Sequence, residues 1–202
     1  MFIGEYGKFN YLTYLGVIFA LIAMALTLNG EPTLAMMAFI MSGVCDLFDG
    51  RFARQFVRTP QQEQYGIEID SLSDMVNFVA FPTVMLLTQA FNNYVSVLVV
   101  IIYALAATNR LAYFNSSTKA EGHGQYFIGL PVTYSALFFP LLYLLDQWFA
   151  MDLFPILSHV MALVLAFLFI WKRPIPKPNG IAYAVFVLLA LLTLVGLGFL
   201  QW

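Results

Sequence analysis

Apolar runs of about 20 residues recur along this chain and constrain its fold more than any other feature. The first run, residues 11–28, and the last, residues 181–200, contain no charged side chain. Hydrophobic residues make up 61% of the sequence and charged residues 10%, whereas a soluble domain carries about 25% charged residues. Because hydrocarbon offers the backbone no hydrogen-bonding partner, each run must pair its own backbone groups as a helix. The sequence therefore predicts an all-α polytopic membrane protein.

Short polar stretches divide the chain into about six to seven candidate transmembrane helices. The predicted spans are 11–28, 33–57, 67–90, 94–113, 127–145, 154–171 and 181–200. We expect polar loops at 58–65 and 115–125, a kink at Pro82, and either a turn or an interfacial segment at 146–155. Residues 1–202 form one predicted membrane domain, with a catalytic core at about 33–135 and C-terminal spans at about 154–201.

The basic residues indicate the orientation, because cytoplasmic loops collect Lys and Arg. In this seven-span division, all nine lie at or next to connections on the same side as the N-terminus: Lys8, Arg51, Arg54, Arg58, Arg110, Lys119, Lys172, Arg173 and Lys177. The predicted connections on the other side contain none. We therefore expect an N-terminus inside the cell and a protein of the cell membrane. The formal net charge of −2 gives no basic patch for nucleic acid.

Four aspartates interrupt the apolar pattern near the predicted cytoplasmic ends of the second and third spans. Asp46 and Asp49 are three residues apart, and Asp70 and Asp74 are four apart, so each pair shares one face of a helix. Ionisable groups within membrane segments are costly and are functional hypotheses by default. Four converging carboxylates would also repel one another unless cations lay between them. The pattern predicts a metal site in a polar cavity open to the cytoplasm.

Two other interpretations of the aspartates are weighed against a metal site. They could pair with Arg51, Arg54 and Arg58 as an inert ion network, although the small residues Gly50 and Ala53 indicate space for a ligand instead. They could also line the pathway of an ion-coupled transporter. A transporter predicts inverted repeats and paired broken helices, and the sequence has neither.

The ligand type indicates the chemistry. Carboxylates without a His or Cys partner suit Mg²⁺ or Mn²⁺, with Ca²⁺ as an alternative. Two such ions about 4 Å apart suit a ligand that contains a diphosphate, because they can stabilise both the attacked phosphorus and the leaving phosphate. A carboxylate that is not fully used on metal could take the proton from an attacking hydroxyl.

The spacing of these residues resembles the signature of the CDP-alcohol phosphotransferase family. The pattern is Asp-x-x-Asp-Gly-x-x-Ala-Arg followed by Gly-x-x-x-Asp-x-x-x-Asp, and its positions here are Asp46, Asp49, Gly50, Ala53, Arg54, Gly66, Asp70 and Asp74. Eleven residues separate Arg54 from Gly66, which is longer than the family pattern usually has, so we expect a longer loop there.

The resemblance implies a role for each signature position. Asp46, Asp49 and Asp70 would be the main metal ligands, and Asp74 would be the general base that also touches the second metal. The positions expected to bind the CDP-lipid are Gly50, Ala53, Arg54 and Gly66. Members of the family transfer a phosphatidyl or similar group from a CDP-linked donor to an alcohol and release CMP. The resemblance also implies a homodimer.

Three further segments resemble the phosphatidylserine synthase branch of this family. They are residues 70–78, 110–115 and 126–131, although Tyr113 and Thr133-Tyr134 depart from the branch pattern. The resemblance thus implies CDP-diacylglycerol as donor and serine as acceptor, with Arg110 and Asn77 as acceptor-binding candidates. Glycerol phosphate, inositol, inositol phosphate or another alcohol remain alternative acceptors.

Overall fold

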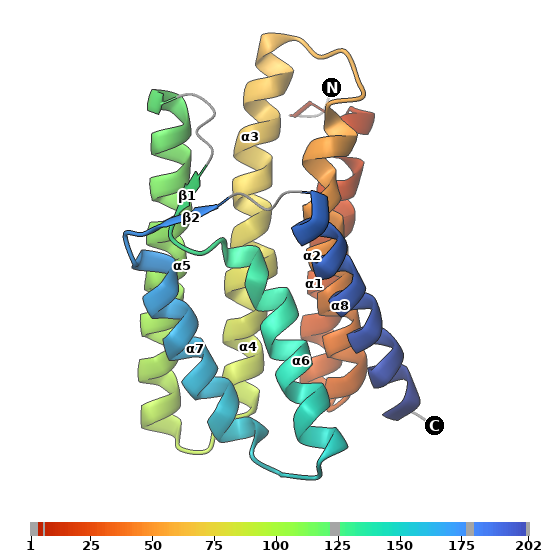
Figure 1. Cartoon of the computed structure of the whole chain (residues 1–202), viewed down its shortest axis with the longest axis vertical. Helices are drawn as coiled ribbons and strands as arrows, with labels where there is room; N and C mark the ends of the chain where they lie inside the picture. Colours follow the sequence, from red (N-terminus) through yellow and green to blue (C-terminus); the bar gives the residue numbers. More distant parts are fainter. Residues whose placement is uncertain (1–3, 6, 122–125, 177–179, 201–202) are drawn as a thin grey trace.

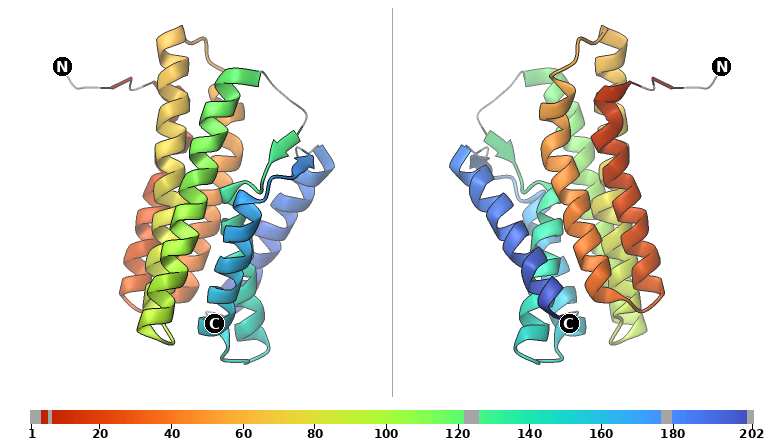
Figure 2. Two further views of the ribbon diagram at one scale, coloured as in Figure 1. Left: turned by 90° about the vertical axis from the view of Figure 1, so that its left-hand side faces the viewer. Right: turned by 90° about the vertical axis from the view of Figure 1, so that its right-hand side faces the viewer.

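The helices of this protein run side by side and are joined at alternating ends (Figures 1 and 2). The computed structural model describes residues 4–5, 7–121, 126–176 and 180–200. The longer helices are α1 (Tyr11–Leu28), α2 (Pro32–Ala53), α3 (Pro60–Asp74), α4 (Phe81–Thr88), α5 (Asn93–Glu121), α6 (Ser135–Trp148), α7 (Phe154–Ile170) and α8 (Gly180–Leu200). Short helical turns occur at η1 (Lys8–Asn10), η2 (Met75–Ala80) and η3 (Val132–Tyr134). This architecture confirms the all-α prediction.

Within the described residues, the longer helices form seven rods that run roughly along the long axis of the molecule, because α3, η2 and α4 follow one another as a single rod (Figure 1). Among the described residues, five helical segments are long and apolar enough to cross a membrane: Lys8–Leu28, Pro32–Ala53, Pro60–Thr88, Asn93–Ser116 and Tyr183–Leu200. The apolar α7 is shorter, with 17 residues, and α6 has 14. Large apolar side chains such as Ile18, Leu105 and Phe167 are exposed, as expected of surfaces that face lipid.

Two expected loops are partly helical, so those predictions were wrong. Helix α3 begins at Pro60 within the predicted loop 58–65, because Thr59 and Gln62 form a capping box and Pro60 suits the first helical turn. The Thr59 hydroxyl accepts from the Gln62 backbone N–H at 3.3 Å, and the Gln62 side chain accepts from the Thr59 N–H at 3.1 Å. Helix α5 continues to Glu121 and so includes residues 115–121 of the other predicted loop, 115–125, whose remaining residues lie outside the described ones. Helix α2 ends at Ala53 rather than near residue 57.

The α6–α7 connection is a turn, which settles the choice between a turn and an interfacial segment at 146–155. Ala150 and Asp152 have positive φ angles of 46° and 52°. The buried Asp146 carboxylate accepts a hydrogen bond from the Leu153 backbone N–H at 2.8 Å. A side chain of α6 thus holds the start of α7 in place.

Two strands of three residues each join two of the connections between helices in the second half of the chain. Strand β1 (Tyr126–Ile128) pairs antiparallel with β2 (Pro174–Pro176), and Phe127 lies opposite Ile175. The α5–α6 and α7–α8 connections are therefore tied together in the same half of the molecule as the α2–α3 connection, but farther from its end (Figure 1).

Candidate active site

Helices α2 and α3 bring the four aspartates together. Asp46 and Asp49 lie in the last two turns of α2, and Asp70 and Asp74 lie in the last two turns of α3. Carboxylate oxygens of Asp46, Asp49 and Asp70 lie within 4.8 Å of one another. Asp74 lines the same cavity as these three residues. The spacing in the sequence therefore corresponds to one cluster in space.

Helix α1 contributes a hydrogen-bond donor to this cluster. The buried Thr13 hydroxyl donates to Asp49 Oδ2 at 2.8 Å. Thr13 was missed in the sequence, although a signal exists: it is a polar residue in the first turn of an otherwise apolar span, at the same end as the aspartates. The contact itself depends on α1 packing along α2, which the sequence does not reveal.

The rod that carries Asp70 and Asp74 widens into a π-helix directly after Asp74. The π-helical segment η2 precedes Pro82, which has no backbone N–H and whose ring crowds the carbonyl of Phe78 four residues earlier. The Tyr103 hydroxyl of α5 donates to that carbonyl at 2.8 Å. The kink expected at Pro82 stays a prediction; the structure shows a π-helical segment before this proline, and Tyr103 supplies a hydrogen bond to the Phe78 carbonyl.

A cavity of about 170 Å³ opens at the four aspartates. Its other walls come from α5, through Arg110, Leu111 and Phe114, and from residues 131–133 before α6. The preceding Gly129 has φ +74°, and a Cβ there would overlap the carbonyl oxygen of Phe169. A glycine is therefore needed at this turn, which directs residues 131–133 toward the carboxylates.

Arg110 is the one cationic side chain among the described residues that line this cavity. It is 6% exposed, and its Nε has no hydrogen-bond partner among the described residues. Its guanidinium carbon lies 5.3 Å from the centroid of the Phe114 ring. A buried guanidinium with free donor capacity can bind a carboxylate or a phosphate.

The other predicted site residues lie outside the lining of the cavity. A Cβ at Gly16 of α1 would lie 3.3 Å from Asn77 Nδ2, so Asn77 packs against α1. Gly66 lies against Arg58, whose Nη1 would be 3.6 Å from a Cβ at this position. Gly50 borders open space, and both Ala53 and the exposed Arg54 lie at the end of α2. A role in binding the CDP group or the acceptor stays a prediction for these residues.

The arginines near the cluster do not neutralise it. Arg51 lies over the Tyr183 ring, 4.1 Å from its centroid, and Arg58 pairs with Glu63 at 3.8 Å. Within the described part of the chain, no aspartate of the cluster forms an ion pair with Arg51, Arg54 or Arg58. The interpretation of the aspartates as an inert ion network is therefore wrong.

The arrangement suits a hard divalent cation. All of its charged ligands are carboxylate oxygens, the ligand type that Mg²⁺, Mn²⁺ and Ca²⁺ prefer. Asp74 Oδ1 is buried and has no hydrogen-bond partner among the described residues. A buried carboxylate oxygen of this kind needs a proton, a cation or a donor from a ligand.

Comparisons with known proteins agree with these observations. A sequence profile described as CDP-alcohol phosphatidyltransferase matches residues 9–171. The chain is 31% identical over 131 residues to a CDP-diacylglycerol–serine O-phosphatidyltransferase of Mycobacterium tuberculosis, a match that covers 62% of this chain and 45% of that protein. The chain thus spans about half the length of the mycobacterial relative.

Two archaeal relatives are similar as well. A CDP-diacylglycerol–serine O-phosphatidyltransferase of Methanocaldococcus jannaschii is 29% identical over 189 residues, which cover 93% of this chain and 83% of that protein. An archaetidylserine synthase of Methanothermobacter thermautotrophicus is 29% identical over 117 residues, which cover 57% and 48%. Since the profile covers most of the helices and includes all four aspartates, the chain belongs to the CDP-alcohol phosphatidyltransferase family.

Proposed function

We propose that this protein transfers the phosphatidyl group of CDP-diacylglycerol to the hydroxyl of serine and releases CMP. One observation carries this proposal: carboxylate oxygens of Asp46, Asp49 and Asp70 lie within 4.8 Å of one another, in a cavity that also holds Asp74 and Arg110. The names of the relatives support serine as the acceptor.

The carboxylates fit a pair of divalent cations, Mg²⁺ or Mn²⁺. Asp46, Asp49 and Asp70 would be the main ligands, and Asp74 would contribute to the second ion. Bound cations would offset the charge of the diphosphate and stabilise the leaving CMP. Because Thr13 donates to Asp49 Oδ2, it fixes the carboxylate so that Oδ1 is left for a cation.

Asp74 is the proposed general base. It accepts the proton of the serine hydroxyl, and the serine oxygen attacks the phosphorus that carries the diacylglycerol. The bond from that phosphorus to the oxygen bridging to CMP breaks, and CMP leaves with the bonding electrons. The orphaned, buried Oδ1 of Asp74 supports this role, because it is free to accept a proton.

Arg110 is the proposed acceptor contact. Its guanidinium would bind the serine carboxylate, which a bidentate pair recognises well. An acceptor that already carries a phosphate, such as glycerol phosphate or inositol phosphate, would favour several basic residues, and Arg110 is the one cation among the described residues that line this cavity.

The remaining proposals concern the cellular setting. The long apolar helices make this an integral membrane protein. The distribution of basic residues supports an N-terminus inside the cell and an active site at the cytoplasmic face of the cell membrane. The homodimer implied by family resemblance stays a prediction.

The deciding experiment measures CMP release by the purified protein. Wild type with CDP-diacylglycerol, Mn²⁺ or Mg²⁺ and serine should release CMP, and a chelator should stop the reaction. Glycerol phosphate, inositol and inositol phosphate are tested in parallel. Release with one of these but not with serine would replace the acceptor, whereas no release with any alcohol would refute the enzymatic proposal and favour the transporter.

A variant of Asp74 tests its proposed role as the general base. Asp74→Asn should lower kcat by at least about 100-fold, the usual effect of losing a general base, while metal-dependent binding of CDP-diacylglycerol persists. Asp152→Asn, an exposed aspartate in the α6–α7 turn, is the matched control and should keep full turnover. Normal turnover of Asp74→Asn would refute its role as the base.

A further inference from the structure

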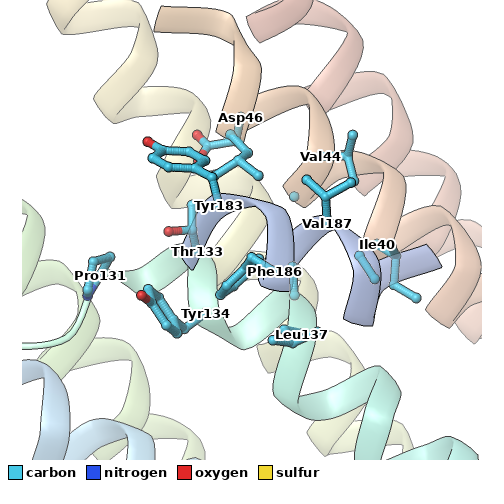
Figure 3. Close-up of a pocket in the computed structure, with 14 residues that line it drawn as sticks. Ile40, Val44, Asp46, Pro131, Thr133, Tyr134, Leu137, Tyr183, Phe186 and Val187 are labelled. Carbon is cyan, nitrogen blue, oxygen red and sulfur yellow. The ribbon is translucent and has the colours of Figure 1, made fainter. Parts of the chain in front are cut away.

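A second cavity, of about 200 Å³, lies between α2, α6 and α8 beside the carboxylates (Figure 3). It shares Asp46, Pro131 and Thr133 with the aspartate cavity. Figure 3 shows Asp46 and Tyr183 near one end, and Ile40 and Leu137 toward the other. The two cavities therefore adjoin at Asp46.

The walls of the second cavity become apolar away from Asp46. Helix α8 contributes Phe186, Val187 and the buried Ala190. From Tyr183 to Ala190 an α-helix rises by about 10 Å. Farther along α8, a Cβ at Gly196 would lie 2.8 Å from Leu144 Cδ2 of α6. The cavity is thus a wedge that ends where α8 closes against α6.

A groove of about 470 Å³ lies along the outer surface of α2 and α8, next to this cavity. Tyr183 and Val187 line both the cavity and the groove. Leu188 and Leu191 in the groove are more than half exposed, at 56% and 53%, on a face that would meet lipid. Apolar side chains thus extend from the lipid-facing groove to the cavity at Asp46. Arg51, which also lines the groove, lies over the Tyr183 ring.

We propose that this α2–α8 seam, defined as the cavity and its outer groove, binds a hydrocarbon chain of the lipid donor, and that Ala190 limits the chain that fits. This inference rests on the proposed function. It assigns a role to α8, which lies beyond residues 9–171 matched by the family profile. A chain in the seam would place its headgroup at Asp46, and each buried methylene would favour binding.

The test narrows the wedge at Ala190 and compares two donors. Ala190→Phe should raise the KM for dioleoyl CDP-diacylglycerol roughly tenfold, equivalent to losing about two buried methylenes. The KM for a dihexanoyl donor, whose chains end before Ala190, and the KM for serine should stay unchanged. The control is Leu192→Phe, two residues along α8 on an exposed position (57%). Equal effects on both donors, or an effect on neither, would overturn the proposal.

A measurement on wild type covers the case in which Ala190→Phe does not fold. CDP-diacylglycerol with a diazirine at the end of one acyl chain is photolysed in the absence of acceptor, so labelling does not require turnover. Labelled peptides should come from α8 and from α2 around Ile40. Labelling confined to α5 and α7 would refute the seam even if CMP release is normal. Labelled α8 in a protein that releases no CMP would refute the proposed reaction and leave the seam standing.

Discussion

Replacing Thr13 by valine tests how the aspartate cluster is held together. The change keeps the shape of the side chain and removes the hydroxyl that donates to Asp49 Oδ2 at 2.8 Å. Both residues are 7% exposed, so water cannot readily replace the lost donor. A buried hydrogen bond to a charged group contributes about 1.5–3 kcal/mol. If the loss appears entirely in metal binding, affinity should fall by about 10- to 150-fold.

The assay titrates Mn²⁺ while CMP release is recorded, and calorimetry measures Mn²⁺ binding directly. Thr13→Val should shift both midpoints to higher Mn²⁺, while kcat at saturating Mn²⁺ stays close to wild type. Thr13→Ser keeps a hydroxyl at the same position and should restore most of the affinity. An unchanged midpoint in Thr13→Val, or a fall in kcat without any shift, would show that the hydrogen bond does not position a metal ligand.

Two further predictions concern the parts of the fold that shape the cavity. Tyr103→Phe should lower the stability by about 1–3 kcal/mol, because it leaves the buried Phe78 carbonyl without its partner, and thermal unfolding in detergent measures the loss; an unchanged midpoint would contradict this account of η2. Gly129→Ala should cost at least about 1 kcal/mol for a non-glycine residue at positive φ, and should also reduce CMP release, since residues 131–133 line the cavity. Gly198→Ala makes the same change on α8, where an added Cβ would have nothing within 4 Å, so this control should keep wild-type stability and CMP release; wild-type behaviour of Gly129→Ala would refute the steric argument.

The helical architecture could be predicted because each span is determined by local sequence. Runs such as residues 11–28 are apolar over the thickness of a bilayer, and in hydrocarbon a helix satisfies its own backbone. The predictions that were wrong concern the ends of helices, where α2, α3 and α5 begin or end at other residues than expected. The stretch 58–65 is polar, so it was expected to be a loop, but its Thr59-Pro60-x-Gln62 start is a helix cap. Polarity indicates exposure to water, and an exposed segment can still be helical when its capping residues favour it.

The aspartate cluster could also be predicted, because its information is contained in spacing. Helical periodicity places Asp46 near Asp49 and Asp70 near Asp74, and the repulsion between carboxylates makes a shared cation the simplest reason to bring the two pairs together. What spacing could not reveal is that Asn77 faces α1 rather than the cavity. The π-helical turn after Asp74 changes which residues share a face, so a count of 3.6 residues per turn fails at that point.

By itself, then, the sequence determined the class of protein, the succession of helices and the four carboxylates, because all of these follow from hydrophobicity and from short-range spacing along one helix. The tertiary structure decided which distant residues complete the site. Thr13 is 36 positions from Asp49 in the sequence, yet it donates a hydrogen bond to that aspartate. Tyr183 comes from the last helix, yet it lines the cavity that adjoins the cluster at Asp46. Contacts between helices depend on how the side chains pack in three dimensions, and no periodicity within a single helix encodes them.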